Sequence, residues 1–316
     1  MKIMASARET FGEVLMELGR TDHDIVAMNA DLSSSTKTSI FAKEFPERFF
    51  NMGIAEQNMM AAAAGLATTG KKVFASTFAV FATGRVYDQI RQSIAYPKTN
   101  VVIVATHGGI TVGGDGASHQ MVEDISLMRS LPNMTVIILA DAVETDRVIR
   151  YIYEHGGPAY IRLPRLSGPV LFGTDYEFTP GKGVVMREGT DITIMAIGLM
   201  VDMAIDAAKE LEKEGISARV VNMACLKPID RELIVKCARE TGAIVTAEEH
   251  SVIGGLGSAV ASVLVQEHPA IQEMLAIPDV FGESGESDEL MEKYGLTKEN
   301  IVLKAQVALK RKGACQ

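Results

Sequence analysis

Short apolar runs alternate with longer amphipathic stretches along the first half of the chain, and this alternation limits the possible folds. Strands that are apolar almost throughout are typical of parallel sheets, because helices cover both faces of such a sheet. The stretches between the runs have the length and periodicity of helices. The pattern predicts strands at 25–29, 72–76, 101–105, 135–139 and 159–163, and helices at 6–19, 54–69, 80–95, 119–130 and 142–155.

The pattern breaks between 163 and 183, where prolines and glycines crowd together, as is typical of a linker. Beyond this break the alternation resumes. It predicts strands at 192–197, 218–223 and 243–247, and helices at 201–214, 230–239 and 255–266. With 316 residues, two domains are expected at roughly 100–200 residues each. We therefore expect two α/β domains, each a largely parallel sheet flanked by helices, at 1–168 and 181–316, with a linker at 169–180.

Composition excludes several classes of protein. The net charge of −9 disfavours nucleic acid as a partner, because phosphate binding requires a basic surface. The longest apolar stretch, 59–67, is too short for a membrane span, and the N-terminus lacks the apolar core of a signal peptide. The cysteines Cys225, Cys237 and Cys315 are scattered, which suits a reducing compartment. We expect a cytoplasmic protein without a membrane or nucleic-acid partner.

Glu56 is an unusual charge because it is the only one between Arg48 and Lys71, at the head of an apolar helix. A carboxylate in such a setting is paired, protonated or functional. Alternatively, it lies in the first helical turn and is stabilised by the helix dipole. The residues alone leave both interpretations open.

Phe78 and Phe81 are three positions apart at the start of the next helix and face the same way. Such a pair usually belongs to the core. In a chain with 6% aromatic residues, however, a wall that binds a flat ring is a reasonable alternative.

A glycine-rich stretch with polar side chains directly follows the strand at 101–105. It contains His107, Asp115 and His119. Loops after the carboxyl ends of parallel strands are where ligands bind, so these residues indicate a polar site. Zinc is a poor candidate, because neither a cysteine nor a helical histidine pair accompanies them. Arg162 and Arg165 near the last strand could hold an anion or simply be solvated.

Taken together, these stretches resemble the thiamine-diphosphate enzymes of the transketolase group. The resemblance is to the pyrimidine-binding domain followed by the transketolase C-terminal domain, and it covers essentially the whole chain. The first half carries it in Gly53-Ile-Ala-Glu56-Gln-Asn58, Ser76-Thr-Phe78 with Phe81, and Gly114-Asp-Gly-Ala-Ser-His119-Gln120. The second half carries it in Leu226-Lys-Pro-Ile-Asp230, Glu248-Glu-His250, Gly254-Gly-Leu-Gly-Ser-Ala-Val260 and Tyr294-Gly-Leu-Thr297.

The resemblance implies a binding site for the aminopyrimidine ring of thiamine diphosphate. Glu56 would be catalytic and share a proton with the ring, Phe78 and Phe81 would pack against it, and Asp31 would contact its edge. Many transketolases have a tyrosine six residues after the first of these phenylalanines, where this chain has Gly84. The pocket would then be more open, or Tyr87 would fill it.

The resemblance also implies a substrate site. Asp115 and His119 would hydrogen-bond the hydroxyl groups of a sugar, and His119 would also be catalytic. The terminal phosphate or sulfonate of that sugar would be bound by Arg8, Ser35, His107 and Arg165.

One part of the family pattern is missing. These enzymes hold the diphosphate and its Mg²⁺ through a Gly-Asp-Gly…Asn motif in a separate domain. Gly114-Asp-Gly116 is not that motif, because the next asparagine, Asn133, lies only 17 positions after Gly116, where the family has a much longer spacer. The resemblance therefore implies no metal ligands in this chain. It implies an N-terminal subunit that carries most of the Mg²⁺ ligands, in an α2β2 heterotetramer.

The expected function is that of the C-terminal catalytic subunit of a split transketolase, which moves a two-carbon ketol unit from an anionic ketose to an aldose. Within the same cofactor class, the alternatives are a deoxyxylulose-phosphate synthase and the β subunit of a 2-oxo-acid dehydrogenase. A third alternative is a regulatory or assembly subunit without catalytic activity.

Overall fold

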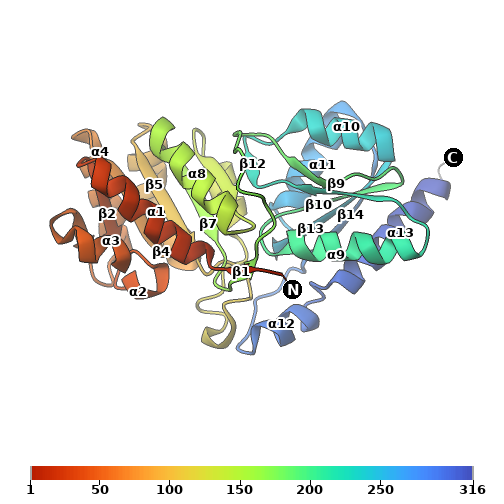
Figure 1. The fold of residues 1–316 in the computed structure, drawn as a ribbon, viewed down its shortest axis with the longest axis horizontal. Helices are drawn as coiled ribbons and strands as arrows, with labels where there is room; N and C mark the ends of the chain where they lie inside the picture. The colour runs from red at the N-terminus through yellow and green to blue at the C-terminus, as the bar shows by residue number, and fades with distance from the viewer. Residues whose placement is uncertain (1, 315–316) are drawn as a thin grey trace.

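The computed structural model describes residues 2–314, so Cys315 lies outside the described residues. The chain forms two α/β units that lie side by side (Figure 1). The first contains a seven-stranded sheet in the order β12-β6-β7-β5-β4-β2-β3, in which all neighbours are parallel except β12 and β6. Its strands are β2 (Ile25–Asn29), β3 (Phe49–Asn51), β4 (Lys72–Phe78), β5 (Val101–Thr106), β6 (Thr135–Ile138), β7 (Ala159–Leu163) and β12 (Cys225–Lys227).

Helices cover both faces of this sheet, as the apolar strands predict. On one face α1 (Ala7–Thr21) and α8 (Ala142–His155) pack against alternate strand residues such as Phe74 and Val102. On the other, α4 (Glu56–Thr68) packs against the intervening residues. Ser6 and Asp141 cap α1 and α8 by accepting hydrogen bonds from backbone N–H groups three residues later. Further helices of this unit are α2 (Ser33–Thr36), α3 (Ser39–Glu44) and α7 (Asp124–Ser130).

The second unit contains a five-stranded sheet in the order β14-β13-β10-β11-β9, in which only β9 is antiparallel to its neighbour. Its strands are β9 (Val184–Arg187), β10 (Ile192–Ala196), β11 (Ala218–Asn222), β13 (Ala243–Ser251) and β14 (Ile271–Ile277). Its helices are α9 (Met200–Lys213), α10 (Arg231–Thr241), α11 (Leu256–Glu267), α12 (Ser287–Lys293) and α13 (Lys298–Ala314). Between residues 2 and 314, none of the helices has the length and apolarity needed to cross a membrane.

The two units are connected by more than the chain between them. The edge strand β12 comes from the second half of the sequence but pairs with β6 of the first sheet. In addition, β1 (Met4–Ala5) at the N-terminus pairs with β8 (Gly168–Pro169), which lies close to the expected boundary.

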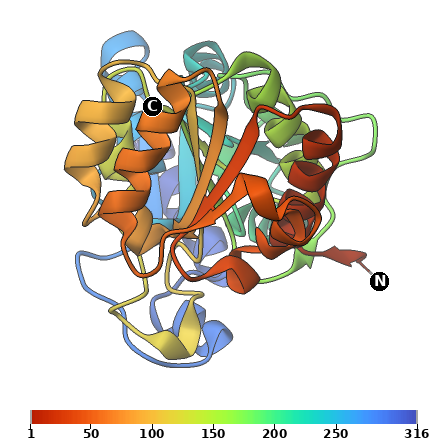
Figure 2. The same cartoon turned by 90° about the vertical axis from the view of Figure 1, so that its left-hand side faces the viewer.

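Two predicted helices differ from the structure. The helix expected at 80–95 is interrupted: α5 (Ala79–Thr83) ends at Gly84, and α6 (Tyr87–Gln89) leads into a π-helical segment, Ile90–Ala95. The helix expected at 119–130 begins only at Asp124. The residues before it belong to a loop, 107–123, which hangs below the first sheet and is drawn in yellow in Figure 2.

Candidate active site

Most of the predicted site residues follow the carboxyl ends of strands in the first sheet. Asp31 and Ser35 follow β2, Glu56 follows β3, and Phe81 comes just after β4. The loop 107–123 follows β5 and carries His107, Asp115 and His119, and Arg165 follows β7. Because these strands are parallel, their carboxyl ends lie along one edge of the sheet, where ligands commonly bind.

Glu56 is the first residue of α4 and is only 3% exposed. Its Oε2 atom pairs with the guanidinium of Arg85 at 3.4 Å. That Arg85 side chain is about half exposed, so the pair lies where a buried carboxylate meets the surface. Glu56 therefore lies in the first turn of a helix and is also paired with a cation.

Phe78 and Phe81 form a parallel aromatic pair, with ring centroids 6.1 Å apart and an interplanar angle of 12°. The edge of His119 lies against Phe81 at 5.3 Å. The guanidinium of Arg85 lies over the Phe81 ring at 4.4 Å and so connects this ring to Glu56. A carboxylate and an aromatic wall therefore share one surface.

The His107 ring stacks on the ring of Phe78 at a centroid distance of 3.8 Å. Its φ of +60° is unusual for a residue other than glycine. Nδ1 contacts the Thr106 hydroxyl at 2.7 Å, so Nε2 is the nitrogen that remains for a ligand. Burial lowers the pKa of His107 to about 3, and the positive charges of Arg8 and Arg165 add to this effect.

The Arg8 side chain connects Ser35 and Arg165 through hydrogen bonds to their backbone oxygens. Arg8 donates to the carbonyl oxygens of Ser35 at 2.5 Å and of Arg165 at 2.6 Å. The Nε atom of Arg8 is buried and has no hydrogen-bond partner among residues 2–314. Burial and the charge of Arg165 lower the pKa of Arg8. Two guanidinium groups and an unused donor make this an electropositive site that fits an anion.

Asp31 and Asp115 are more peripheral. Both are exposed. Asp31 has a φ of +59° and exchanges hydrogen bonds with Asn51, whereas Asp115 lies in a short helical turn, Gly113–Asp115, at the tip of the loop 107–123. The structure places both residues at the rim, and it shows no bond between either of them and Glu56 in the described part of the chain.

Arg162 behaves differently from both expectations, since it is neither solvated nor free to hold an anion. Its side chain is buried and pairs with Asp124 at 3.0 Å, and it also donates to the backbone oxygen of Glu249 at 2.8 Å. Burial lowers the proton affinity of this group, but the charges of Asp124 and Glu249 outweigh it and raise the pKa of Arg162.

Sequence reasoning missed Arg85. The resemblance drew attention to Gly84 and Tyr87, but the Tyr87 hydroxyl bonds Ser130 at 2.8 Å, while Arg85 covers Phe81. The only signal in the sequence is Gly84, where the predicted helix is interrupted.

These residues fit the aminopyrimidine of thiamine diphosphate, because a flat, apolar ring with polar nitrogens requires an aromatic wall beside a buried carboxylate. Phe81 and Glu56 provide these two groups on one surface. Among the described residues, no group of three or more His, Cys, Asp or Glu side chains could hold a metal ion.

Comparisons with known proteins identify both halves of the chain. The pyrimidine-binding domain of transketolase matches residues 4–170, and the transketolase C-terminal domain matches residues 181–301. A solved structure described as a split-gene transketolase in an inactive β4 tetramer is 58% identical, with a TM-score of 0.91, and covers 97% of this chain and 99% of that one.

Two curated relatives have almost the same length as this chain. One is provisionally named a transketolase C-terminal section, from Methanocaldococcus jannaschii; it is 51% identical over 96% of both chains. The other is the 6-deoxy-6-sulfo-D-fructose transketolase subunit SqwH of a Clostridium species; it is 43% identical over 96% of this chain and 95% of that one. Two family matches in the expected order, together with relatives of the same length, show that the chain belongs to the transketolase family, whose members depend on thiamine diphosphate.

Proposed function

We propose that this chain is the catalytic C-terminal subunit of a split transketolase, which transfers a two-carbon ketol unit from an anionic ketose to an aldose. The observation that carries this proposal is the shared surface of buried Glu56 and the Phe81 ring, with His119 against the same ring. Its domains would be a pyrimidine-binding domain at 1–168 and a C-terminal domain at 181–316, joined at 169–180.

Thiamine diphosphate, when bound, supplies the chemistry that cleaves and forms carbon–carbon bonds. Glu56 would hold a proton at the carboxylate oxygen that faces the aminopyrimidine. Burial suits this role, because a desolvated carboxylate shares a proton more readily than one in water. Phe78 and Phe81 would exclude water from the ring, and Asp31 would contact the edge of the site.

The electropositive site formed by Arg8 and Arg165 would bind the anionic end of the sugar, with Ser35 and the neutral His107 as further hydrogen-bonding groups. Guanidinium groups bind phosphate and sulfonate by similar charge-assisted hydrogen bonds. Asp115 and His119 would contact the sugar hydroxyls, and His119 would act near the reacting carbonyl because it lies against Phe81.

A second polypeptide is needed to complete the site. The chain lacks the Gly-Asp-Gly…Asn motif, so we propose that an N-terminal subunit holds the diphosphate and the Mg²⁺, in an α2β2 complex of the cytoplasm. The relative whose structure is described as an inactive β4 tetramer supports a requirement for a partner.

Calorimetric titration of thiamine diphosphate and Mg²⁺ tests this proposal. We expect no binding to the chain alone and tight binding once the diphosphate-domain subunit is added. A panel of ketose phosphates, ketose sulfonates and pyruvate then identifies the substrate class. Use of pyruvate in place of the ketoses would indicate a deoxyxylulose-phosphate synthase or a 2-oxo-acid dehydrogenase.

Two other outcomes would overturn parts of the proposal. Tight binding to the chain alone would show that the diphosphate anchor lies within this chain. A loaded complex of proven stoichiometry that is inactive on the whole panel would indicate a regulatory subunit. Light scattering tests the assembly, since a complex that stays one-to-one at saturating concentration contradicts α2β2.

A further inference from the structure

Three consecutive polar residues, Glu248, Glu249 and His250, are buried at the carboxyl end of β13. Buried polar groups destabilise a fold unless each has a partner, so their contacts indicate what they do. Together with Ser251 they form what we call the β13 end segment, residues 248–251. This segment belongs to the second half of the chain, but it lies against the loop 107–123 of the first half.

Glu249 contacts the loop directly. Its Oε1 atom accepts a hydrogen bond from the backbone N–H of Thr111 at 2.7 Å. The carbonyl oxygen of Thr111 accepts from the Ser287 hydroxyl at 2.9 Å. Both backbone polar groups of Thr111 are therefore held by residues more than a hundred positions away, in the second half of the chain.

The start of the loop is shaped to receive Glu249. A Cβ atom on Gly109 would lie 2.2 Å from the carboxyl carbon of Glu249, and Gly109 has a φ of +82°. A Cβ atom on Gly108 would lie 2.1 Å from Nε of Arg162, which in turn donates to the Glu249 backbone oxygen at 2.8 Å. Only glycine leaves space for these two buried side chains.

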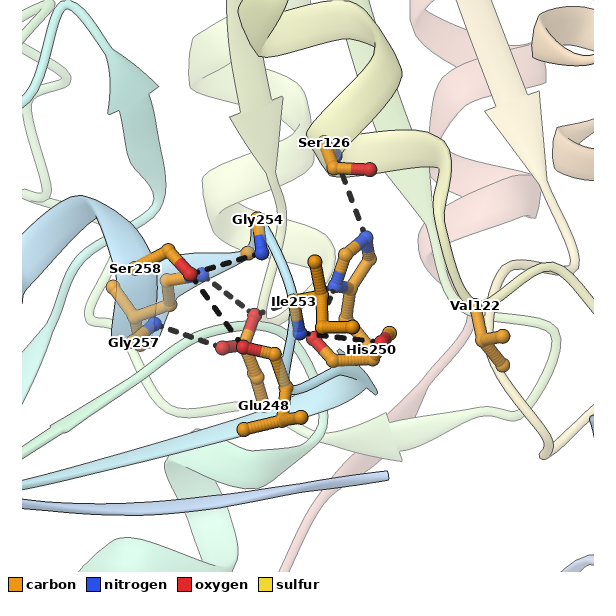
Figure 3. A network of polar contacts seen from close by, with 12 residues as sticks. Val122, Ser126, Glu248, His250, Ile253, Gly254, Gly257 and Ser258 are labelled. Atoms are coloured by element: carbon orange, nitrogen blue, oxygen red, sulfur yellow. Dashed lines mark hydrogen bonds and ion pairs between the residues drawn. The ribbon is translucent and has the colours of Figure 1, made fainter. Parts of the chain in front are cut away.

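The other end of the loop is held by the next two residues of the segment, of which Figure 3 labels His250. The backbone N–H of Ser251 donates to the carbonyl oxygen of Val122 at 2.7 Å. His250 donates through Nδ1 to the Ser251 carbonyl at 2.7 Å, so its Nε2 can accept from the backbone N–H of Ser126, at 3.4 Å. That N–H lies in the first turn of α7, directly after the loop.

Glu248 fixes the segment itself. Its two carboxylate oxygens accept hydrogen bonds from the backbone of Leu256 at 2.6 Å and of Gly257 at 2.8 Å, in the first turn of α11. This carboxylate caps the helix and ties the end of β13 to the second unit. The segment is therefore anchored on one side and binds both ends of the loop on the other.

We propose that the β13 end segment positions the loop 107–123, and that Glu249 is a positioning residue that keeps His119 against Phe81. The tip of the loop can transmit this effect because it is internally bonded: Gly113–Asp115 forms a helical turn, and the backbone N–H of His119 donates to Gly116 at 3.0 Å. The inference deepens the proposed function and rests on it, since it assumes that the loop binds the sugar.

Substitution of Glu249 in the complete two-subunit complex tests this inference. Glu249→Ala should lower kcat/KM for the ketose donor by about 10- to 100-fold, because a displacement of about 1 Å has effects of this size. Glu249→Gln should recover much of the loss, because its amide oxygen can still accept from Thr111. The affinity for thiamine diphosphate should change less than threefold, since Glu56 and Phe81 lie outside the loop.

Glu144 provides a matched control. It is also buried and also binds the other half of the chain, through Asn222 at 2.7 Å, but its hydrogen bonds do not involve the loop. Glu144→Ala should lower the Tm without a comparable loss of kcat/KM per folded enzyme. If Glu249→Ala does not fold, Ser287→Ala is the second variant, because it removes the other bond to Thr111. It should also lower kcat/KM, through a higher KM.

Hydrogen exchange separates this inference from the proposed function, because it needs no substrate. Amides at 108–120 should exchange faster in Glu249→Ala than in the wild type or Glu144→Ala. Unchanged exchange and kcat/KM in folded Glu249→Ala would overturn the inference even if the wild type is an active transketolase. An inactive wild type with faster exchange in Glu249→Ala would instead overturn the function and leave the positioning of the loop supported.

Discussion

Arg85 reaches the carboxylate of Glu56 at 3.4 Å while its guanidinium covers the ring of Phe81 at 4.4 Å. One exposed side chain thus touches two of the groups proposed to bind the aminopyrimidine. A flat ring that stacks on the covered face of Phe81 must displace the Arg85 side chain. Arg85 therefore occupies, in the chain without cofactor, the surface that the aminopyrimidine would bind.

Replacement of Arg85 by alanine tests this competition. An exposed cation–π contact contributes about 0.5–1 kcal/mol. The ion pair adds to this, because its Glu56 partner is buried although Arg85 is about half exposed. Removal of both should leave the affinity of the two-subunit complex for thiamine diphosphate unchanged or make it up to about tenfold tighter, at about 1.4 kcal/mol per factor of ten. Calorimetry on Arg85→Ala measures this directly.

Arg91 provides the control for Arg85→Ala. It is an exposed arginine six residues further along the chain, and within residues 2–314 it has no bond to Glu56 or Phe81. Arg91→Ala should bind the cofactor as the wild type does. Weaker binding by more than tenfold in Arg85→Ala alone would show that Arg85 is a ligand rather than a competitor.

Glu56→Gln tests the role of the buried carboxylate. The amide has nearly the same shape but cannot share a proton, so kcat should fall by about 10²- to 10⁴-fold, which is the usual contribution of a positioned acid or base. The affinity for the cofactor should change much less. Steady-state kinetics and calorimetry on the same complex separate these effects, and full turnover by Glu56→Gln would contradict the proposed role.

Strand prediction succeeded where the signal was local. The strand at 25–29 matches β2, because its five residues are all buried and apolar runs of that kind have few alternatives. Glu56 was singled out as the lone charge of an apolar stretch, Phe81 by its spacing from Phe78, and His107 by its place in a loop after a strand. All three follow strand ends, which parallel strands bring to one edge of the sheet.

Other features depend on contacts that the sequence does not reveal. The interruption after Thr83 turns Arg85 towards Phe81, although the local pattern is that of a continuous helix. The bond between Thr111 and Glu249 joins residues 138 positions apart. Arg162 is buried and pairs with carboxylates from both halves of the chain, Asp124 and Glu249. Its proximity to Arg165 in sequence suggested that both bind an anion, but Arg162 is already paired.

Arg165→Ala tests the electropositive site. Charge-assisted hydrogen bonds contribute about 1.5–3 kcal/mol, so KM for an anionic ketose should rise about 10- to 100-fold. A neutral ketose with the same reacting end should show little change. Equal losses for the anionic and the neutral sugar would mean that Arg165 supports the fold of the site, through its bond to the Val112 carbonyl, rather than the anion.

His107 should make stability depend on pH. Because burial lowers its pKa to about 3, the folded imidazole stays neutral where the unfolded one, with a pKa near 6.5, takes up a proton. The unfolded state therefore binds more protons below about pH 6.5. The contribution of the neutral His107 to the free energy of unfolding is lost as the pH falls from there towards 3. Between pH 7 and pH 5 this amounts to about 2 kcal/mol.

Urea unfolding of the wild type and His107→Asn at both pH values measures this contribution, since the variant should lose about 2 kcal/mol less on acidification.

Histidine NMR provides an independent test of the His107 pKa. Arg165→Gln removes one of the positive charges that lower the pKa of His107, so this pKa should rise. A bound phosphate should act in the same direction, because it neutralises Arg8 and Arg165. If phosphate binds but the His107 resonance still does not titrate at higher pH, the anion lies away from this histidine.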